Sequence, residues 1–512
     1  MSAPPSPASS YQMILRSSSV MGVASVLNVA LGVVRMKAAA VLLGPTGVGL
    51  FGMYLNLLQT GAAVASLGLD MAGTRRIAAE HGRGDSGGVE LARRALLLGT
   101  LLLAVVGGGV FAWLSGWIAA HVLGDPGRAA QIRWLALGIA LAVAAASQSA
   151  LLTGLRRIGD LARIQIGSAA AATALGVAAL WAWGESGLLV MVLAVPAATL
   201  AQGLWYTRRL RRHAMAPAAW PQIAGELRTL VQLGTAFMLS GAVNTLGQLS
   251  VRGIVQRSLG ADALGYFQAA WDIGMVYLGF VLGAMATDYY PRLAATMGDA
   301  RAATRLVNEQ TEVALLLSGP ALLALLGTAP WVIHLLYSPE FAPAAHILRW
   351  QLLGDVLKVM SWPLGFVLLA AGAGKTFVVA ETLGIGVFVA ATALGVKPFG
   401  PIAAGWGFLI MYLCYLPFVY ALARARIGFR WQSAVWRQGL ALFLAAAVVS
   451  TLGHMNAALS AFVGIASAIA FGLHALLRLT QRTGLDAGPA AGMQARLVRC
   501  GQMIRRTLGR KP

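Results

Sequence analysis

The stretch from Arg349 to Lys358 reads RWQLLGDVLK, and it places an acid and a base inside a long apolar segment. Asp355 and Lys358 stand three residues apart, so a helix presents both side chains on one face. Neither can face lipid cheaply, because a charge at the centre of a membrane helix costs at least about 2.5–3.5 kcal/mol. We therefore expect the pair to face protein or a water-filled cavity, and it is a candidate part of a transport route.

The composition around this stretch is that of a membrane protein. Of 512 residues, 58% are hydrophobic and 11% are charged, with a mean hydropathy of +0.72, whereas soluble domains carry about 25% charged residues. The 61 glycines suit helices that pack closely in lipid. We predict an all-α polytopic membrane protein with about 14 spans, at 14–43, 46–69, 92–121, 130–154, 163–183, 187–207, 229–256, 263–288, 309–337, 342–371, 376–396, 402–424, 437–453 and 457–478.

The net charge of +21 is distributed asymmetrically over these spans. With the N-terminus in the cytoplasm, 30 of the 39 lysines and arginines fall on the cytoplasmic side and 5 on the opposite side. The positive-inside rule describes this asymmetry, so we predict cytoplasmic N- and C-termini. Anionic membrane lipids are expected partners of the basic loops. Nucleic acid is not, because the basic residues are divided among short loops.

The chain also contains an internal repeat with an offset of 216 residues. The matches are Leu43-Gly44, Gly49 and Phe51 with Leu259-Gly260, Gly265 and Phe267; Arg133-Trp134 and Leu137-Gly138 with Arg349-Trp350 and Leu353-Gly354; and Arg76 with Arg292. Because each copy holds six spans, both enter the membrane from the same side and are related by an axis along the membrane normal. The predicted organisation is a disordered cytoplasmic tail (1–13), an N-lobe of six helices (14–207), a basic cytoplasmic linker (208–228), a C-lobe of six helices (229–424), two extra transmembrane helices (437–478) and a basic cytoplasmic tail (479–512).

Polar residues within the spans differ between the two lobes. The equivalent pairs are Asn56 and Asp272, Gln165 and Glu381, Ile139 and Asp355, and Ala142 and Lys358. In the first span of each lobe, Arg35 and Lys37 bracket the position equivalent to Arg252. If these first helices face each other across a cavity, its wall is cationic and suits a lipid diphosphate head. We predict that Arg35, Lys37, Arg252 and Lys358 bind substrate, and that Asn56, Asp272, Asp355 and Glu381 line the cavity or couple the transport cycle.

Each of these residues has a structural alternative. Arg35, Lys37, Arg252 and Lys358 can extend to the membrane interface, where their charge is hydrated. Lys358 can pair with Asp355 and hold helices together. Asp272 and Glu381 can form hydrogen bonds between helices, or they can bind H+ or Na+ as coupling ions.

No cofactor is predicted. The two cysteines and the seven histidines are scattered without metal-ligand spacing, so we expect no metal site. The turn Gly372-Ala373-Gly374-Lys375-Thr376 ends like a phosphate-binding loop, but Leu369 stands where the leading glycine is required. We therefore do not expect an ATP-hydrolysing enzyme.

The phrase Trp350-Gln351-Leu352, Gly354-Asp355, Leu357-Lys358, with Ala380-Glu381 after it, resembles the Wzx-type flippases for O-antigen and enterobacterial common antigen units. The turn Gly44-Pro45, Gly47, Gly49-Leu50 and the stretch 284–293, AMATDYYPRL, are similar to that family as well. The resemblance covers residues 14–424 and implies the multidrug/oligosaccharidyl-lipid/polysaccharide exporter superfamily. The extra pair of C-terminal spans resembles the fourteen-span layout of the peptidoglycan-precursor flippases.

The resemblance implies a protein of the bacterial inner membrane that moves an undecaprenyl-diphosphate-linked oligosaccharide from the cytoplasmic to the periplasmic leaflet by alternating access. A polysaccharide polymerase and a chain-length regulator are then candidate partners. Two alternatives remain open at this point. One is a cation-coupled exporter of drugs or small amphiphiles, and the other is a scaffold within a polysaccharide-assembly complex.

Overall fold

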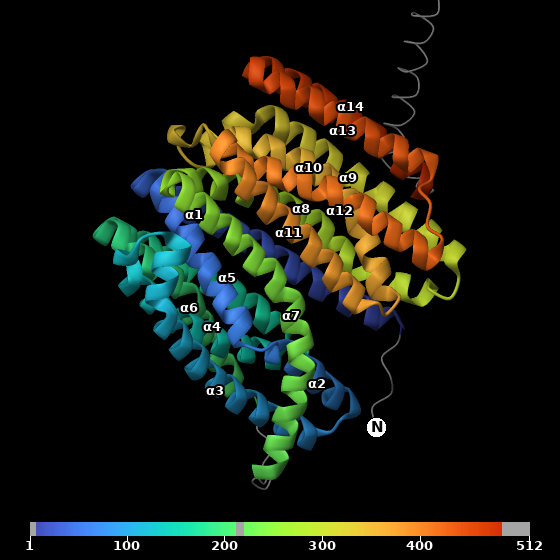
Figure 1. The fold of residues 1–512 in the computed structure, drawn as a ribbon. Helices are drawn as coiled ribbons and strands as arrows, with labels where there is room; N and C mark the ends of the chain where they lie inside the picture. The colour runs from blue at the N-terminus through green and yellow to red at the C-terminus, as the bar shows by residue number, and fades with distance from the viewer. Residues whose placement is uncertain (1–6, 211–219, 484–512) are drawn as a thin grey trace, which may run out of the picture. The chain divides into compact units, whose positions relative to one another are not determined.

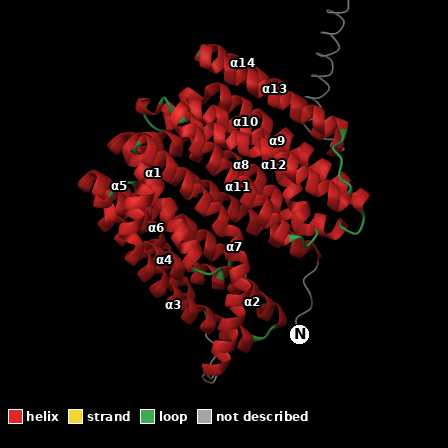
Figure 2. Cartoon of the chain, in the orientation of Figure 1, coloured by secondary structure: helices red, strands yellow, loops and turns green. Residues whose placement is uncertain are grey.

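A computed structural model describes residues 7–210 and 220–483, and all regular structure within them is helical (Figure 1, Figure 2). The α-helices are α1 (Pro7–Ala65), α2 (Leu69–Arg83), α3 (Ser86–Ile118), α4 (Ala129–Gly154), α5 (Ile158–Trp183), α6 (Gly187–Arg208), α7 (Trp220–Leu259), α8 (Ala261–Thr296), α9 (Ala300–Leu336), α10 (Ala344–Ala370), α11 (Gly374–Phe399), α12 (Ile402–Ile427), α13 (Ser433–Met455) and α14 (Ala457–Thr483). A π-helical turn, Ala119–Leu123, follows α3, and three short 3-10 turns lie at Pro126–Arg128, Gly184–Ser186 and Pro339–Phe341.

Most of the described chain consists of apolar helices of membrane length. Ten stretches are long and apolar enough to span a bilayer, or eleven if the bent pair within α8 counts as one span. Two of the ten, Met21–Ala65 and Ile158–Arg208, have 45 and 51 residues, which at about 1.5 Å per residue is more than twice a hydrocarbon core of about 30 Å. Each therefore holds two of the predicted spans. The prediction of an all-α polytopic membrane protein is confirmed, although α7, which holds the predicted span 229–256, is not among the ten.

The first double-length stretch is divided by a glycine. Gly44, inside α1, has φ 64° and ψ −162°, a backbone conformation that glycine adopts without steric cost. Pro45 follows, and proline suits the first position of a new helical segment because its missing N–H would have no partner there. The dipeptide thus ends one span and begins the next.

By their internal contacts, the residues fall into two compact units. Unit 1 comprises residues 1–272, 333–347 and 378–411, and unit 2 comprises 273–332, 348–377 and 412–512. Part of the core of unit 1 is a cluster of small and branched side chains from α2, α3, α4 and α7, in which Leu69, Ile77, Leu96, Leu151 and Leu230 are buried. In unit 2, the extra hairpin of α13 and α14 packs on α9 and α10, where Gly464 lies against Gly327 and Gly439 against Met360.

These units do not coincide with the lobes that the repeat predicts, because α8 and α10 are each divided between them. The lobe boundaries stay a prediction. Two predicted connecting segments are partly helical: α1 begins at Pro7 within the predicted tail 1–13, and α7 begins at Trp220 within the predicted linker 208–228. Pro221 is tolerated there because the first turn of a helix needs no N–H donor. Residues 1–6, 211–219 and 484–512, including most of the predicted basic tail, lie outside the described residues.

Candidate functional site

Arg252 is a fully desolvated cation on α7, in unit 1. Its side chain is 3% exposed, and its Nε donates a hydrogen bond to Oε1 of Gln268 at 3.0 Å. The Nη1 atom donates to the backbone carbonyl of Gln248 at 3.3 Å. The rings of Phe267 and Trp271 flank the guanidinium at 5.6 and 5.5 Å from their centroids, within the range of cation–π attraction. Arg252 therefore does not extend to the membrane interface in this structure.

Asp272 is joined to Arg252 through an amide. The Nε2 group of Gln268 donates to Oδ1 of Asp272 at 2.8 Å, while Oε1 of the same amide accepts from Arg252. The second carboxylate oxygen, Oδ2, is buried and has no hydrogen-bond partner. A buried carboxylate oxygen without a donor is costly, so this atom is suited to take up a proton or another cation.

The other two cations of unit 1 lie on α1. The Lys37 amine donates to the backbone carbonyls of Tyr337 and His334, the latter at 3.4 Å. The Lys37 side chain also lines a groove of about 840 Å³ between α1 and α5, whose remaining lining residues are Val34, Ala38, Val41, Leu42, Thr173, Ala174, Val177, Ala178 and Trp181. Arg35 is half-buried, and its Nε has no hydrogen-bond partner.

The remaining polar candidates of unit 1 are Asn56 and Glu381. Asn56 is 5% exposed, and its Oδ1 has no hydrogen-bond partner. Glu381 is half-buried on α11. The structure thus joins Arg252 with Asp272, and it gives both members of the equivalent pair Asn56 and Asp272 an unsatisfied oxygen.

Unit 2 contains the acid–base pair of α10. Asp355 is completely buried; Oδ2 accepts a hydrogen bond from the Tyr277 hydroxyl at 3.0 Å, and Oδ1 has no partner. Lys358, one turn further along α10, directs its amine to the Met275 sulfur at 3.5 Å. One turn before Asp355, the amide of Gln351 is 2% exposed and neither its oxygen nor its nitrogen has a partner. This face of α10 is polar and enclosed.

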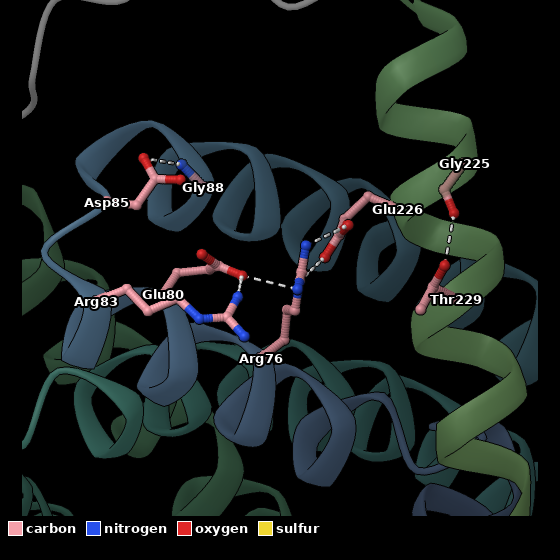
Figure 3. Close-up of polar contacts among 8 residues, drawn as sticks. All are labelled: Arg76, Glu80, Arg83, Asp85, Gly88, Gly225, Glu226 and Thr229. Atoms are coloured by element: carbon pink, nitrogen blue, oxygen red, sulfur yellow. Dashed lines mark hydrogen bonds and ion pairs between the residues drawn. The ribbon is translucent and has the colours of Figure 1, made fainter.

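A third polar cluster ties the first half of α7 to α2. Arg76 of α2 bonds Glu226 of α7 at 2.6 Å and Glu80 at 2.7 Å, and Glu80 also meets Arg83 (Figure 3). Glu226 is 9% exposed. The hydrogen bond to Glu226 raises the pKa of the Arg76 guanidinium above its usual value.

Sequence reasoning did not identify three of these polar residues: Gln268, Tyr277 and Gln351. Gln268 stands one turn before Asp272, and Gln351 one turn before Asp355, so helical spacing could have found both. Tyr277 is brought to Asp355 only by the packing of α8 on α10. Within residues 7–210 and 220–483, no three His, Cys, Asp or Glu side chains come together as a metal site would require.

The chain is similar in sequence to one protein family and to two flippases of known function. Residues 14–297, just over half of the chain, match the family model described as polysaccharide biosynthesis protein. The lipid III flippases of Escherichia coli K12 and Shigella flexneri are each 24% identical to the chain over 415 residues, covering 79% of it and 96% of their own length.

Solved structures share the fold. An inward-facing multidrug-resistance MATE family transporter of the MOP superfamily aligns with a TM-score of 0.69 at 16% identity, covering 80% of this chain and 96% of its own. The lipid II flippase MurJ, in an inward closed conformation, aligns with a TM-score of 0.67 at 11% identity, covering 91% of this chain and 99% of its own. The resemblance inferred from the residues around Asp355 is thereby confirmed: the chain belongs to the polysaccharide biosynthesis protein family.

Proposed function

We propose that the protein is a flippase for a polyprenyl-diphosphate-linked oligosaccharide in the bacterial inner membrane. The observation that carries the proposal is its alignment along 96% of two lipid III flippases, in a chain of the polysaccharide biosynthesis family. A flippase moves its substrate without making or breaking a covalent bond, so no catalytic residue is required.

Buried cations support this substrate class. Arg252 is held in place by Gln268 and by two aromatic rings, so its guanidinium is pre-organised. A diphosphate is the anion that an Arg fork binds bidentately, and the low-dielectric surroundings strengthen the attraction. Arg35 and Lys37 are the other cations of unit 1 for which the sequence predicts substrate binding, and we propose that they contribute to the same recognition during the cycle.

We propose that translocation proceeds by alternating access, in which the two repeats rock against each other around the substrate site. The net basic charge of the loops supports an orientation with both termini in the cytoplasm. Transport would then run from the cytoplasmic to the periplasmic leaflet.

The proposal is tested by replacing Arg252 in cells that lack the chromosomal copy of the gene. Arg252→Ala is expected to abolish display of the surface polysaccharide, and Arg252→Lys to retain part of it, because lysine keeps the charge but not the fork. Arg301→Ala, which removes an exposed arginine at the start of α9, is the matched control and should leave display unchanged. Membrane protein level and insertion are measured in each strain, so that misfolding is recognised.

The result that contradicts the proposal is normal polysaccharide display from the Arg252→Ala variant. Normal display from Arg252→Ala at normal protein level would remove the assigned role of the buried guanidinium. The fold similarity to a MATE transporter favours one second candidate, a cation-coupled exporter of drugs or small amphiphiles. That function predicts altered drug susceptibility and unchanged surface polysaccharide when the gene is deleted.

A further inference from the structure

The two copies of the repeat meet through equivalent residues where α1 packs on α8 in unit 1. The Thr46 hydroxyl of α1 donates a hydrogen bond to Oδ1 of Asp262 on α8. A Cβ at Gly49 would lie 2.5 Å from a backbone carbonyl of α8, and a Cβ at Gly265 would overlap the Pro45 carbonyl of α1. Because 46 is equivalent to 262 and 49 to 265, the contact is reciprocal, as in an interface on a two-fold axis. We call Thr46, Gly49, Asp262 and Gly265 the repeat seam.

A second reciprocal contact joins the two copies at helix ends, also within unit 1. The Lys37 amine of α1 donates to the backbone carbonyl of Tyr337, which follows α9. The Arg257 Nη1 of α7 donates at 2.9 Å to the backbone carbonyl of His121, in the π-helical turn that follows α3. Residues 121 and 337 are 216 positions apart, so the accepting carbonyls are repeat equivalents. Each copy thus supplies one cation to the other.

The two donors also correspond to each other. They lie on the first helix of each copy, and Arg257 is equivalent to Val41, which stands four residues after Lys37. Four residues are about one helical turn, so the two cations project from the same face of equivalent helices. The reciprocity therefore extends to donors as well as acceptors.

The accepting carbonyls lie where a helix attracts a cation. The last carbonyls of a helix have no N–H partner within it, and the helix dipole gives them negative partial charge. His334, in the last turn of α9, offers a second carbonyl to Lys37 at 3.4 Å. The π-helical turn ends at Gly124, and a Cβ there would lie 3.3 Å from the Arg257 stem. The cation that caps each helix end belongs to the other copy, so these caps depend on how the copies meet.

We propose that Lys37 and Arg257, bound to the carbonyls of Tyr337 and His121, form a two-fold latch that holds the repeat seam closed. Both are positioning residues, because in the latch they act on the other copy and not on substrate. The predicted topology places this end of α1 on the periplasmic side, so the latch shuts the transport route there. This role rests on the proposed transport function, to which it adds the contact that must break for outward opening. Lys37 becomes available to substrate when the latch opens.

The bonds of the latch are suited to break and form again. Arg257 is exposed and Lys37 is half-buried, and both donate to neutral carbonyls. After release, the cations and the carbonyls can be hydrated, so no buried charge is left without a partner. The first half of α7 is anchored separately, by Leu230 in the core cluster with α2, α3 and α4. Each latch bond is expected to change the ratio of closed to open protein by about threefold to tenfold.

A buried cysteine beside the seam measures this ratio. Val48, next to Gly49, is fully buried, and so is its repeat equivalent Leu264, next to Gly265. Val48→Cys is introduced into full-length protein carrying Cys414→Ser and Cys500→Ser, in proteoliposomes without lipid-linked substrate. A membrane-impermeant thiol reagent is added outside at fixed pH. Because a buried thiol reacts only when the protein opens, the modification rate is proportional to the open fraction. Leu264→Cys serves as the second reporter.

Lys37→Met and Arg257→Met each remove a donor and keep an apolar stem. Each is expected to raise the modification rate about threefold to tenfold, and the double variant about tenfold to a hundredfold, since separate bonds contribute independently. Lys37→Arg and Arg257→Lys keep a charged donor and should stay within about twofold of the parent. Lys397→Met and Arg133→Met change exposed cations on the same predicted side and are the matched controls, with the parent rate expected.

A control-like rate in either Met variant, with both reporters, would overturn the two-fold latch. An equal rise in the matching charge-retaining variant would overturn it as well, because the rise would then follow from packing and not from the bond. Leu188→Cys, fully buried on α6 within the first copy, is the reporter of a parallel series. Its rate should not change, and a rise as large as at Val48 would show that the variants loosen the copy itself, which also contradicts the latch.

The test is separate from that of the flippase assignment. No lipid-linked substrate is present in the proteoliposomes, so failure of the latch leaves that assignment standing. Polysaccharide display from the Arg252→Ala strain measures the assignment independently, because Arg252 takes no part in the latch bonds.

Discussion

At Gly49 and Gly265, backbone meets backbone because neither residue has a side chain. A methyl group at either position would overlap a carbonyl of the other repeat. We expect Gly49→Ala and Gly265→Ala to destabilise the protein by about 1–3 kcal/mol, the usual range for overpacking. Gly241→Ala is the matched control within α7, since nothing lies near its Cβ position, and it should be neutral or stabilising by up to about 1 kcal/mol. Thermal unfolding of purified protein in detergent measures both signs, and equal midpoints for all three variants would contradict the reciprocal contact.

Asp355 depends on a single hydroxyl for one of its oxygens. Tyr277→Phe removes that donor while conserving the ring, so a carboxylate that is already completely buried loses its partner at Oδ2. We expect a loss of about 1–3 kcal/mol in stability. Tyr290→Phe changes a tyrosine that is 41% exposed and should change stability by less than about 0.5 kcal/mol. Identical unfolding midpoints for the two variants would show that the Tyr277 hydroxyl does not support Asp355.

At the scale of elements, α7 is the helix whose two halves differ most in their surroundings from what the repeat alone predicts. By sequence it opens the second lobe, yet its first half packs on α2 and α3, where Leu230 is buried and Arg76 bonds Glu226. Glu226→Ala is expected to raise amide hydrogen exchange in residues 220–230 and lower stability by about 0.2–1 kcal/mol, since Arg76 is 35% exposed and screened by solvent. Asp288→Ala, which breaks an exposed pair in α8, should leave exchange in residues 220–230 unchanged. Unaltered exchange in Glu226→Ala would mean that apolar packing alone anchors this half of α7.

At the scale of the whole molecule, the orientation in the membrane is open to a direct test. Asp299 and Glu340 are exposed and flank α9, which spans 37 residues between them. In a protein without Cys414 and Cys500, Glu340→Cys should react with a membrane-impermeant maleimide added outside intact spheroplasts. Asp299→Cys should react only after permeabilisation, because the basic loops are retained in the cytoplasm. The reverse labelling pattern would invert the proposed topology and the direction of transport.

Helical content and duplication could be predicted from the sequence for simple physical reasons. In lipid, backbone N–H and C=O groups can form hydrogen bonds only within the protein, as they do in a helix. Long apolar stretches such as 92–121 therefore indicate membrane-spanning helices directly. The match of Arg133-Trp134 with Arg349-Trp350 likewise predicts two copies of the repeat, because a constant offset of 216 residues can be recognised along the sequence alone. The helical start at Pro7 and the course of α7 through residues 220–228 could not be predicted in this way. Residues 220–228 are mostly exposed, and the ion pair of Glu226 with Arg76 joins them to another helix, which no local pattern shows.

The candidate residues were found from the sequence, whereas their partners were not. Charge within an apolar span singles out Arg252, Asp272 and Asp355, because lipid penalises each of them wherever the helix lies. That Gln268 stands between Arg252 and Asp272, or that Tyr277 reaches Asp355, depends on which helices pack together and at what rotation. The sequence by itself thus determined the class of protein, its duplication and the identity of its costly side chains, since these follow from local composition. Only the tertiary structure decided that Thr46 meets Asp262 and Gly52 meets Gln268, because contact across 216 residues is set by packing, which no local pattern contains.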